Sequence, residues 1–366
     1  MRYSHTAVGI SDVDLGGRVT RWRVKRGLTQ VQLARLIGLD QSILSRIENG
    51  RRRVSTTELA ELAAVLKIDP LELLEETPLS EAVVVAARGA VTDVEADVDA
   101  IRLAIEILRT WRSVAADGFE PRLGRRPKMP RLSSNDVAAG NRAANFVREH
   151  LGLSTEPLGD MSALAASLGL AVVLRHFDGD FDGVCVADGP RATAILNSNH
   201  WGSRQRFTTA HEIAHWILGD VDGGPCSDID VFRPSNARER RANAFAATFL
   251  VPDEALAHLH EFASAISLGF EYGVSLKTLG WRIENVLHET ELAEHLRNIE
   301  PWRASELVGC EEAYERDGGA RFREGMSFQL EVAFRKAAAA GAISERHLAA
   351  LLPSLGEESG ESEPLT

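Results

Sequence analysis

Residues 211–215 of the chain have the pattern His-Glu-x-x-His. On a helix, His211 and His215 lie on one face, one turn apart, so that their ring nitrogens can bind one metal ion. Glu212 follows His211 directly and can reach a metal-bound water from the side. The metal lowers the pKa of that water, and the carboxylate takes its proton as the water attacks a peptide carbonyl. Glu212 would then protonate the leaving amine, so the pattern predicts metal-dependent peptide hydrolysis.

The flanking residues indicate that this pattern lies on a buried helix. Residues 207–210 and 216–218 are Phe-Thr-Thr-Ala and Trp-Ile-Leu, so the other face of the helix is apolar. Buried histidine and glutamate side chains without partners would destabilise the protein, whereas a bound metal ion would give them a partner. A chance match is uncommon even in a chain with eleven histidines. We therefore predict a metal site.

A catalytic zinc ion usually has three protein ligands and one open position. The best candidate for the third ligand is Glu239, because the 24 residues that separate it from His215 allow a loop and an antiparallel return. Asn243 lies one turn further on the same face and could orient a ligand. Glu239 could instead be a carboxylate that only stabilises a helix N-terminus. The loop between the two helices holds competing candidates: Asp220, Asp222, Asp228 and Asp230.

The metal pattern and its surroundings resemble the ImmA/IrrE-type zinc metallopeptidases. Residues 206–215 are similar to the active-site helix of that family. Residues 239–252 are similar to its ligand helix, with a Glu, then Ala-Asn, Phe-Ala-Ala and a closing proline. Asn197 and Arg206 also fit, and residues 274–282 resemble a segment that follows the ligand helix in the family.

This resemblance covers roughly residues 135–290 and implies a zinc enzyme. One departure is Gly219, where members often carry another histidine. Such proteins typically cleave one repressor of the Cro/phage-repressor type, which relieves transcription during DNA damage, mobile-element induction or phage attack. The expected protein substrate is therefore a repressor or an antitoxin, and general digestion is not expected.

A second unit precedes the metal pattern, since residues 15–76 have the pattern of five short helices. Thr29 and Ser55 each begin a helix with a capping box. Gly50 stands where a helix needs a left-handed C-cap. Residues 15–76 resemble the helix-turn-helix of the Cro/phage-repressor (XRE) family, because the caps, turn and apolar positions of residues 28–50 all agree with it.

In that family the second helix of the motif enters the major groove of double-stranded DNA. Gln and Arg can bond bases bidentately, whereas phosphate contacts position the protein without reading sequence. Residues 1–75 hold only 12 basic and 9 acidic side chains, so a homodimer on a two-fold operator is expected. The residues expected to meet base edges are Gln41, Ser42 and Arg46. Those expected to contact phosphates are Gln30, Asn49, Arg51, Arg52 and Arg53.

The composition is that of a globular protein, with 366 residues, 44% hydrophobic residues and a net charge of −12. No apolar run reaches the length of a membrane span, and the N-terminus lacks the layout of a signal peptide. The three cysteines are dispersed and odd in number, so they imply no disulfide framework and leave the metal site to His and Glu. We expect a cytoplasmic protein without membrane partners.

The expected fold is multidomain: an all-α helix-turn-helix domain, an α+β zincin-like domain with a small sheet, and a helical C-terminal extension. Strands are expected at 170–175, 183–187 and 192–196, and helices at 202–218 and 235–250. Residues 121–131 contain three prolines and five basic residues, which predicts an extended, solvated linker. The expected domains are 1–76 (helix-turn-helix), 77–134 (helical and basic Pro-rich linker), 135–260 (metallopeptidase), 261–352 (helical) and 353–366 (acidic, disordered).

Two functions fit these patterns. The first is a DNA-binding zinc endopeptidase that cleaves a repressor or antitoxin. The second is a transcription regulator whose peptidase-like domain senses a ligand or a metal without cutting. The presence of Glu212 favours the enzyme. A third possibility joins the two, because the chain's own helix-turn-helix resembles the substrate class and the chain could cut itself near residues 121–131.

Overall fold

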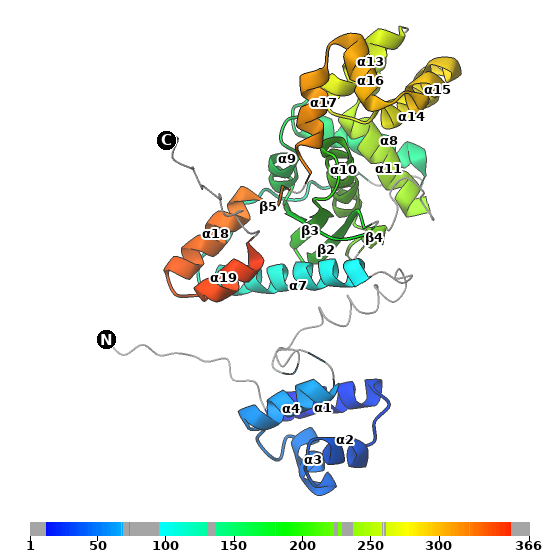
Figure 1. Cartoon of the computed structure of the whole chain (residues 1–366). Coiled ribbons are helices and arrows are strands. Elements are labelled where there is room, and N and C mark those ends of the chain that lie inside the picture. Colours follow the sequence, from blue (N-terminus) through cyan, green and yellow to red (C-terminus); the bar gives the residue numbers. More distant parts are fainter. Residues whose placement is uncertain are drawn as a thin grey trace, which may run out of the picture. The chain divides into compact units, whose positions relative to one another are not determined.

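The computed structural model describes residues 12–66, 68, 73, 95–130, 136–179, 181–222, 226–228, 237–257, 259, 261–321 and 323–352. The chain forms two compact units, Met1–Glu81 and Ala82–Thr366 (Figure 1). Of the helix expected after Asp69 only Leu73 is described, and the acidic tail 353–366 lies outside the described residues. In the part of the chain that is described, no helix is long and apolar enough to cross a membrane.

The first unit is helical, and its helix ends confirm the predicted caps. Thr29 Oγ1 accepts a hydrogen bond from the Gln32 N–H, while the Gln32 side chain accepts one from the Thr29 N–H. Ser55 and Glu58 form the same reciprocal pair. Gly50 has a φ of 64°, as a left-handed C-cap requires. The helices are α1 (Asp12–Lys25), α2 (Gln30–Leu36), α3 (Gln41–Glu48) and α4 (Thr56–Leu66).

Apolar side chains from all four helices meet in one core, in which Val19, Leu33, Leu44 and Leu62 are fully buried. Helix α1 packs closely against the end of α3 at Gly16, where a Cβ atom would lie 2.3 Å from the Ile47 carbonyl oxygen. Only glycine permits this approach. The core and the close contact fix the orientation of α3 within the unit.

The second unit is built around a five-stranded mixed sheet in the order β4-β2-β3-β1-β5. β1 runs parallel to β3, while β2 is antiparallel to both β3 and β4. The β2–β3 hairpin turns at Gly189, whose φ is 60°. The three longer strands fall where the sequence predicts strands. The strands are β1 (Leu170–Arg175), β2 (Gly183–Asp188), β3 (Arg191–Asn197), β4 (Cys226–Asp228) and β5 (Gly325–Met326).

Helices cover both faces of this sheet. Helix α7 (Glu95–Ala116) packs on β2 and β3 from one side, and helix α10 (Gly202–Leu218) packs on the same strands from the other (Figure 1). The central strands are therefore buried on both faces, which is why they have continuous apolar runs. This arrangement buries α10, the helix of the His-Glu-x-x-His pattern, against the middle of the sheet.

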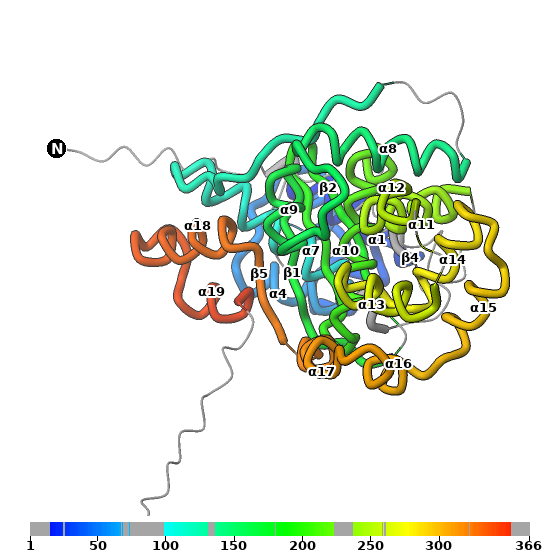
Figure 2. Tube along the Cα trace, turned by 90° about the horizontal axis from the view of Figure 1, so that it is seen from above, coloured from blue at the N-terminus to red at the C-terminus, as the bar shows by residue number. Residues whose placement is uncertain are grey.

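Two further helices hold α10 in place. Helix α8 (Val137–His150) lies along α11 (Ala237–Leu250), and α11 packs on α10 (Figure 2). The α8–α11 contact is close because Gly140 has no side chain, and a Cβ atom there would lie 2.2 Å from the Arg241 carbonyl oxygen. Helix α9 (Met161–Ser167) precedes β1 and is capped by Asp160. The two long helices at 202–218 and 237–250 agree with the sequence prediction.

The rest of the second unit is helical, as expected for the C-terminal region. Its last part returns to the sheet, because β5 pairs with β1 and α18 packs on α7. The predicted order of a helical domain, an α+β region and a helical extension is thus confirmed. The remaining helices are α12 (Asp253–Leu256), α13 (Phe262–Tyr272), α14 (Leu276–Leu287), α15 (Thr290–Asn298), α16 (Pro301–Val308), α17 (Glu311–Gly318), α18 (Phe328–Ala339) and α19 (Glu345–Leu351).

Residues 119–130 form no helix or strand, as expected, but they are packed rather than solvated. Gly124 donates its N–H to the Ala166 carbonyl at the end of α9, and a Cβ atom there would collide with the Ser167 carbonyl oxygen. The Arg126 guanidinium lies 4.4 Å above the centre of the Trp216 ring on α10. The predicted solvated linker is wrong for this stretch, because Gly124 packs on α9 and Arg126 packs on α10.

Candidate metal centre

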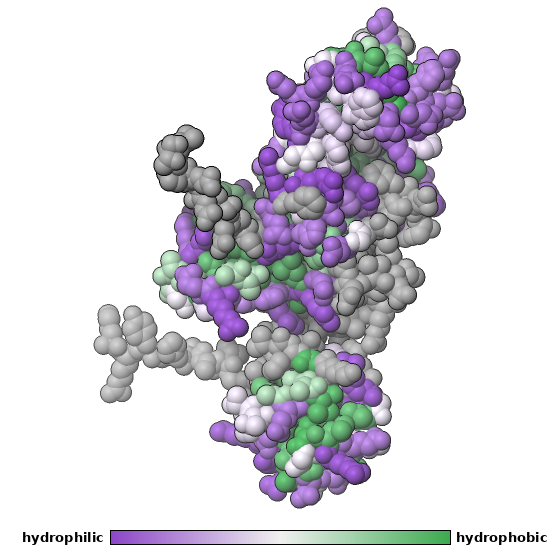
Figure 3. All heavy atoms as spheres, viewed as in Figure 1, coloured by the Kyte–Doolittle hydropathy of each residue, from purple (hydrophilic) through white to green (hydrophobic). Residues whose placement is uncertain are grey.

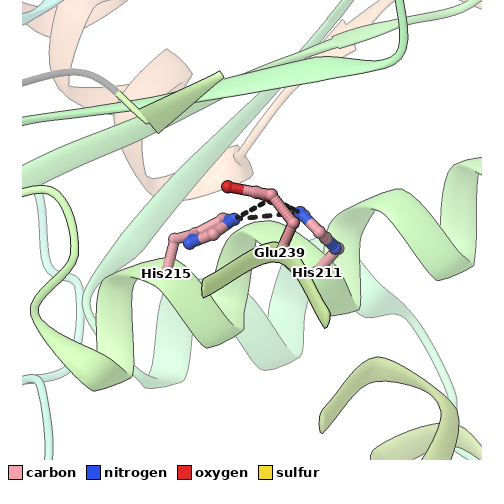
Figure 4. A group of neighbouring side chains, drawn as sticks. All are labelled: His211, His215 and Glu239. Atoms are coloured by element: carbon pink, nitrogen blue, oxygen red, sulfur yellow. Dashed lines mark hydrogen bonds and ion pairs between the residues drawn. The ribbon is translucent and has the colours of Figure 1, made fainter. Parts of the chain in front are cut away.

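The candidate site is formed where α10 and α11 face each other. Two turns of α10 present His211 and His215 on one face, and the first turn of α11 brings Glu239 against them (Figure 4). The three side chains point toward one another, and at most 3% of each residue is exposed. Gly219, with a φ of 76°, ends α10 and reverses the chain immediately after His215.

Three potential ligand atoms converge at this point. The Nε2 atoms of His211 and His215 are 2.9 Å apart, and Glu239 Oε2 lies 3.1 Å from each of them. One ligand atom from each of the three residues lies within 4.8 Å of the others. The structure therefore brings together the two histidines and the carboxylate that the sequence predicts as a ligand set.

The other nitrogen of each imidazole ring is held by a neighbouring side chain. The Nδ1 atom of His211 lies 2.8 Å from Asn243 Oδ1, and that of His215 lies 3.0 Å from Asp220 Oδ2. In neutral rings, donation from Nδ1 leaves a lone pair on Nε2, directed at the centre of the site. The predicted position of Asn243 beside the ligands agrees with this geometry.

The electrostatics of the site favour a neutral His211 and an ionised Glu239. Burial lowers the pKa of His211 and outweighs the hydrogen bond to Glu239, which acts in the opposite direction. Burial alone would raise the pKa of Glu239, but the two imidazole rings beside its carboxylate keep that pKa well below its usual range. The Glu239 carboxylate is therefore the anionic group of the cluster.

This donor set fits a divalent cation. When both rings carry their proton on Nδ1, two nitrogen lone pairs and a carboxylate oxygen lie within 3.1 Å of one another, and a positive charge between them removes their repulsion. Imidazole and carboxylate groups are ligands that zinc prefers, and three protein ligands leave a fourth position open. His211, His215 and Glu239 are therefore the residues that could hold the metal.

Glu212 is buried beside this cluster and faces strand β2. A Cβ atom on Gly183, the first residue of β2, would lie 3.1 Å from Glu212 Oε1 and 2.8 Å from the Thr208 methyl group. The lack of a side chain at Gly183 thus leaves room for the carboxylate of Glu212 between α10 and the sheet. This role of Gly183 could not be predicted from the sequence, because only the packing of β2 on α10 reveals it.

A second missed feature is the support of His215. Asp220 was considered as a competing metal ligand, but its carboxylate accepts hydrogen bonds from His215 and, at 2.5 Å, from Arg241. These contacts hold the pKa of Asp220 below its usual range despite burial, which alone would raise it. Asp222, another competitor, forms a two-point ion pair with Arg126. Gly219, four residues after His215, is the sequence feature that could have indicated that Asp220 folds back onto the histidine.

Replacing Asp220 by alanine is expected to weaken zinc binding by about 10- to 100-fold, because His215 loses the group that fixes its ring and its tautomer. Arg241 would also lose its buried partner. Competition with a chelating dye measures the affinity, and Asp222→Ala is the matched control from the same turn. Equal zinc affinity of Asp220→Ala and wild type would contradict this role for Asp220.

Two residues that match the ImmA/IrrE pattern, Asn197 and Arg206, lie outside the metal cluster. Their side chains support loops. The Asn197 side chain donates to the carbonyl oxygens of Phe177 and Phe181, and so holds the segment between β1 and β2. Arg206 donates to the carbonyl oxygens of Leu158 and Gly159 before α9. Both side chains fix connections that surround the N-terminal half of α10.

In the first unit, the residues expected to meet bases lie on the surface of α3. Gln41, Ser42 and Arg46 are all exposed. Gln41 donates to Gln30 Oε1 at 2.9 Å, and Gln30 in turn donates to Glu48 Oε2 at 2.7 Å. The helix therefore presents polar groups at its N-terminal end, where a helix-turn-helix contacts DNA.

The residues expected to contact phosphates are divided between exposed and paired groups. Arg51, Arg53 and Asn49 are exposed, and the Asn49 side chain donates to the Ser45 carbonyl at 2.7 Å. Arg52 forms an ion pair with Glu58 at 2.8 Å, and its hydrogen bond lowers the pKa of that carboxyl group. Arg52 thus also supports the start of α4.

The sequence analysis also missed a buried ion pair that holds the first unit together. Arg23 on α1 makes a bidentate contact with Glu48 on α3, with distances of 2.6 and 3.1 Å. Because Glu48 also accepts from Gln30, it connects α1, α2 and α3. The sequence around Glu48 is typical of exposed polar residues, so it does not indicate that the Glu48 side chain is buried.

Comparison with known families assigns both units. Residues 19–73 match the helix-turn-helix family, and residues 171–284 match the IrrE N-terminal-like domain, a metallopeptidase-type family. Over 67 residues, the chain is 37% identical to the uncharacterized HTH-type transcriptional regulator y4dJ of Sinorhizobium fredii. That match covers 18% of this chain and 87% of the relative.

Two solved structures are also similar. The restriction-modification controller protein C.AhdI from Aeromonas hydrophila is 41% identical, with a TM-score of 0.17, over 17% of this chain and 96% of that protein. Bacillus thuringiensis PlcR, in complex with the peptide PapR7 and DNA, is 15% identical with a TM-score of 0.17. That match covers 93% of this chain and 99% of PlcR.

Proposed function

The chain belongs to the helix-turn-helix family of transcriptional regulators and carries an IrrE-like domain, and we propose that it is a DNA-binding zinc endopeptidase. Its substrate is one regulatory protein, a repressor or an antitoxin, whose cleavage relieves repression. The convergence of His211, His215 and Glu239, with Glu212 beside them, is the observation that carries this proposal.

The ligand residues and their supports define how the site would work. A zinc ion bound by the three ligands would lower the pKa of a water molecule and polarise the scissile carbonyl. Glu212 takes a proton from the attacking water and returns it to the leaving amine. Asn243 and Asp220 keep the imidazole rings in the tautomer that presents Nε2 to the centre.

Glu212 is suited to this work by its surroundings. It is 1% exposed and lies where Gly183 leaves space between α10 and β2. A carboxylate in such a site is held in one orientation and is poorly hydrated, which favours proton transfer to and from a neighbouring group. An exposed glutamate on the same helix would lack both properties.

The proposal is tested by comparing new protein N-termini in cells that carry the wild-type protein and in cells that carry Glu212→Gln. A cut at one site in one regulatory protein, present with wild type and absent with the variant, is expected. The same cut must then be reproduced with the purified substrate and zinc. If no cut depends on Glu212 although zinc is bound, the peptidase proposal is wrong.

A second candidate function is a regulator that senses a metal or a ligand without proteolysis. The observation that favours it is the joining of a DNA-binding domain to the metal cluster in one chain. The same experiment separates the two functions. A sensor would bind zinc and change its DNA affinity with zinc, but it would leave every protein intact.

DNA binding is proposed to use the exposed face of α3, and a second copy of the chain is expected on a two-fold operator. The face of the first unit seen in Figure 3 carries a hydrophobic area. Val24, Val31 and Leu36 in this unit are each more than half exposed. Exposed apolar side chains of this kind fit a contact between two copies.

Replacing Arg46 by alanine is expected to weaken binding to the preferred operator by about 5- to 150-fold, the loss of one base contact of 1–3 kcal/mol. The operator is first obtained by selection from random DNA with wild-type protein. Arg35→Ala, an exposed change on α2, is the control. Unchanged affinity and unchanged base preference in Arg46→Ala would exclude Arg46 from the interface.

A further inference from the structure

A pocket of about 430 Å³ lies in the second unit, away from the metal cluster. We call it the aromatic pocket, because Trp201, Phe270, Trp302 and Tyr314 form its walls. Trp201 precedes α10, Phe270 lies on α13, Trp302 on α16 and Tyr314 on α17. The pocket therefore lies where the C-terminal helices meet the start of the active-site helix, and its volume is in the range of small-molecule sites.

The aromatic walls are held by close packing. The Trp201 and Tyr314 rings have their centres 5.1 Å apart with an angle of 40° between them. A Cβ atom on Gly318 would lie 3.0 Å from the Trp201 ring, so that ring rests directly on the end of α17. Trp302 is 50% exposed, an unusual position for the largest apolar side chain. The ring of Trp302 is therefore accessible to a ligand.

The charges around the pocket favour a cation. Arg204 contributes to the wall, but its guanidinium makes bidentate hydrogen bonds of 2.7 and 2.9 Å to the fully buried Asp182. Its charge is therefore compensated. Asp317 accepts hydrogen bonds from the N–H and hydroxyl groups of Ser203.

Glu300 adds a second carboxylate to the pocket lining, in addition to Asp317. It stands at the N-cap position of α16, next to Trp302, and its side chain makes no capping hydrogen bond there. Glu300 is exposed and belongs to the lining of the pocket. A carboxylate beside several aromatic faces is the combination that attracts an organic cation.

We propose that the aromatic pocket is a binding site for a small organic cation, such as an aryl-alkyl quaternary ammonium compound. The cation lies against the faces of Trp201, Trp302 and Tyr314, which attract positive charge through their ring quadrupoles. Glu300 at the rim gives the long-range attraction. This site is separate from the metal cluster, and the proposal does not depend on the peptidase function.

A ligand in the aromatic pocket would contact residues at the start of the active-site helix α10. The pocket is lined by Trp201, Ser203 and Arg204 at the start of α10, and by residues of α16 and α17. A bound cation would join these C-terminal helices to the helix that carries His211 and His215. The ligand would thereby stabilise the start of α10, so it is expected to raise the melting temperature of the full chain.

The test is calorimetric titration of the full-length protein with benzyltrimethylammonium. Benzyl alcohol and phenylacetate serve as the neutral and anionic probes that share its ring. We expect the cation to bind at least about tenfold more tightly than benzyl alcohol, and phenylacetate to show no measurable binding. Equal affinity for the three probes would overturn the proposal, because the pocket would then select only for a ring.

Two variants locate the site. Trp302→Ala and Glu300→Gln are each expected to weaken binding of the cation by about tenfold. Trp281→Ala is the matched control, because Trp281 is 51% exposed, lies outside the pocket and already stacks on Arg297. Circular dichroism checks that each variant is folded. Binding that survives both pocket variants, or that is lost equally in Trp281→Ala, would place the cation elsewhere and disprove the proposal.

Discussion

Replacing Glu212 by glutamine is expected to lower the cleavage rate of the protein substrate by about 10²- to 10⁴-fold while zinc stays bound. Glutamine has nearly the same size, so the space left by Gly183 remains filled. It cannot accept a proton from water, however, and it cannot return one to the leaving amine. Single-turnover cleavage of the identified substrate measures the rate, and metal analysis measures the zinc content.

The matched control is Glu254→Gln, the same change at an exposed position on α12. This variant is expected to cleave at the wild-type rate. Three results are informative together: loss of cleavage in Glu212→Gln, retention of zinc in the same variant, and full activity in the control. If Glu212→Gln cleaves as fast as wild type, another group takes the proton and the assigned role of Glu212 is wrong.

The helices and strands near the site could be predicted from the sequence, because local signals determine them. Gly219 ends α10 in a left-handed conformation, and the apolar runs of β1, β2 and β3 mark strands buried on both faces. The pair of histidines also needs only helical periodicity to share one face. None of these inferences requires knowledge of a distant contact.

The third ligand could be proposed but not selected from spacing alone. Glu239 lies 24 residues after His215 and the loop acids Asp220 and Asp222 lie 5 and 7 residues after it, and none of these spacings excludes a ligand. Their separation in space depends on the packing of α8 on α11, which positions the first turn of α11 over α10. Such a contact between segments about 100 residues apart leaves no local signal.

Residues 119–130 illustrate the same limit. Three prolines and several basic residues nearby are typical of a solvated linker. In the structure, Arg126 instead stacks on Trp216 and pairs with Asp222, in the turn that also carries Asp220. An arginine can be recognised as buried or paired only when its partner is known, and here the partner is 96 residues away.

Replacing Glu239 by glutamine is expected to weaken zinc binding more than about a hundredfold. Zinc sites with four protein ligands bind with roughly 10–16 kcal/mol, or about 3 kcal/mol for each ligand, and 1.4 kcal/mol corresponds to a factor of ten. The variant also removes the only formal negative charge among the three ligands. Chelator competition measures the affinity, and metal analysis of the purified protein measures the stoichiometry.

Asp230→Asn is the control. This change also removes one carboxylate charge, and Asp230 is another residue that the sequence suggests as a third ligand. It is expected to keep the wild-type affinity. A hundredfold loss in Asp230→Asn with none in Glu239→Gln would transfer the ligand role to the loop.

The stability of the metal-free protein gives an independent test of the same assignment. Without a cation, the buried Glu239 carboxylate faces two imidazole nitrogens at 3.1 Å. Glutamine can donate a hydrogen bond to one of these nitrogens, so metal-free Glu239→Gln is expected to melt at or above the temperature of metal-free wild type. Zinc should raise the melting temperature of the wild-type protein but not that of Glu239→Gln. A residue kept only for packing would show the opposite order, since its replacement would destabilise the protein whether or not zinc is present.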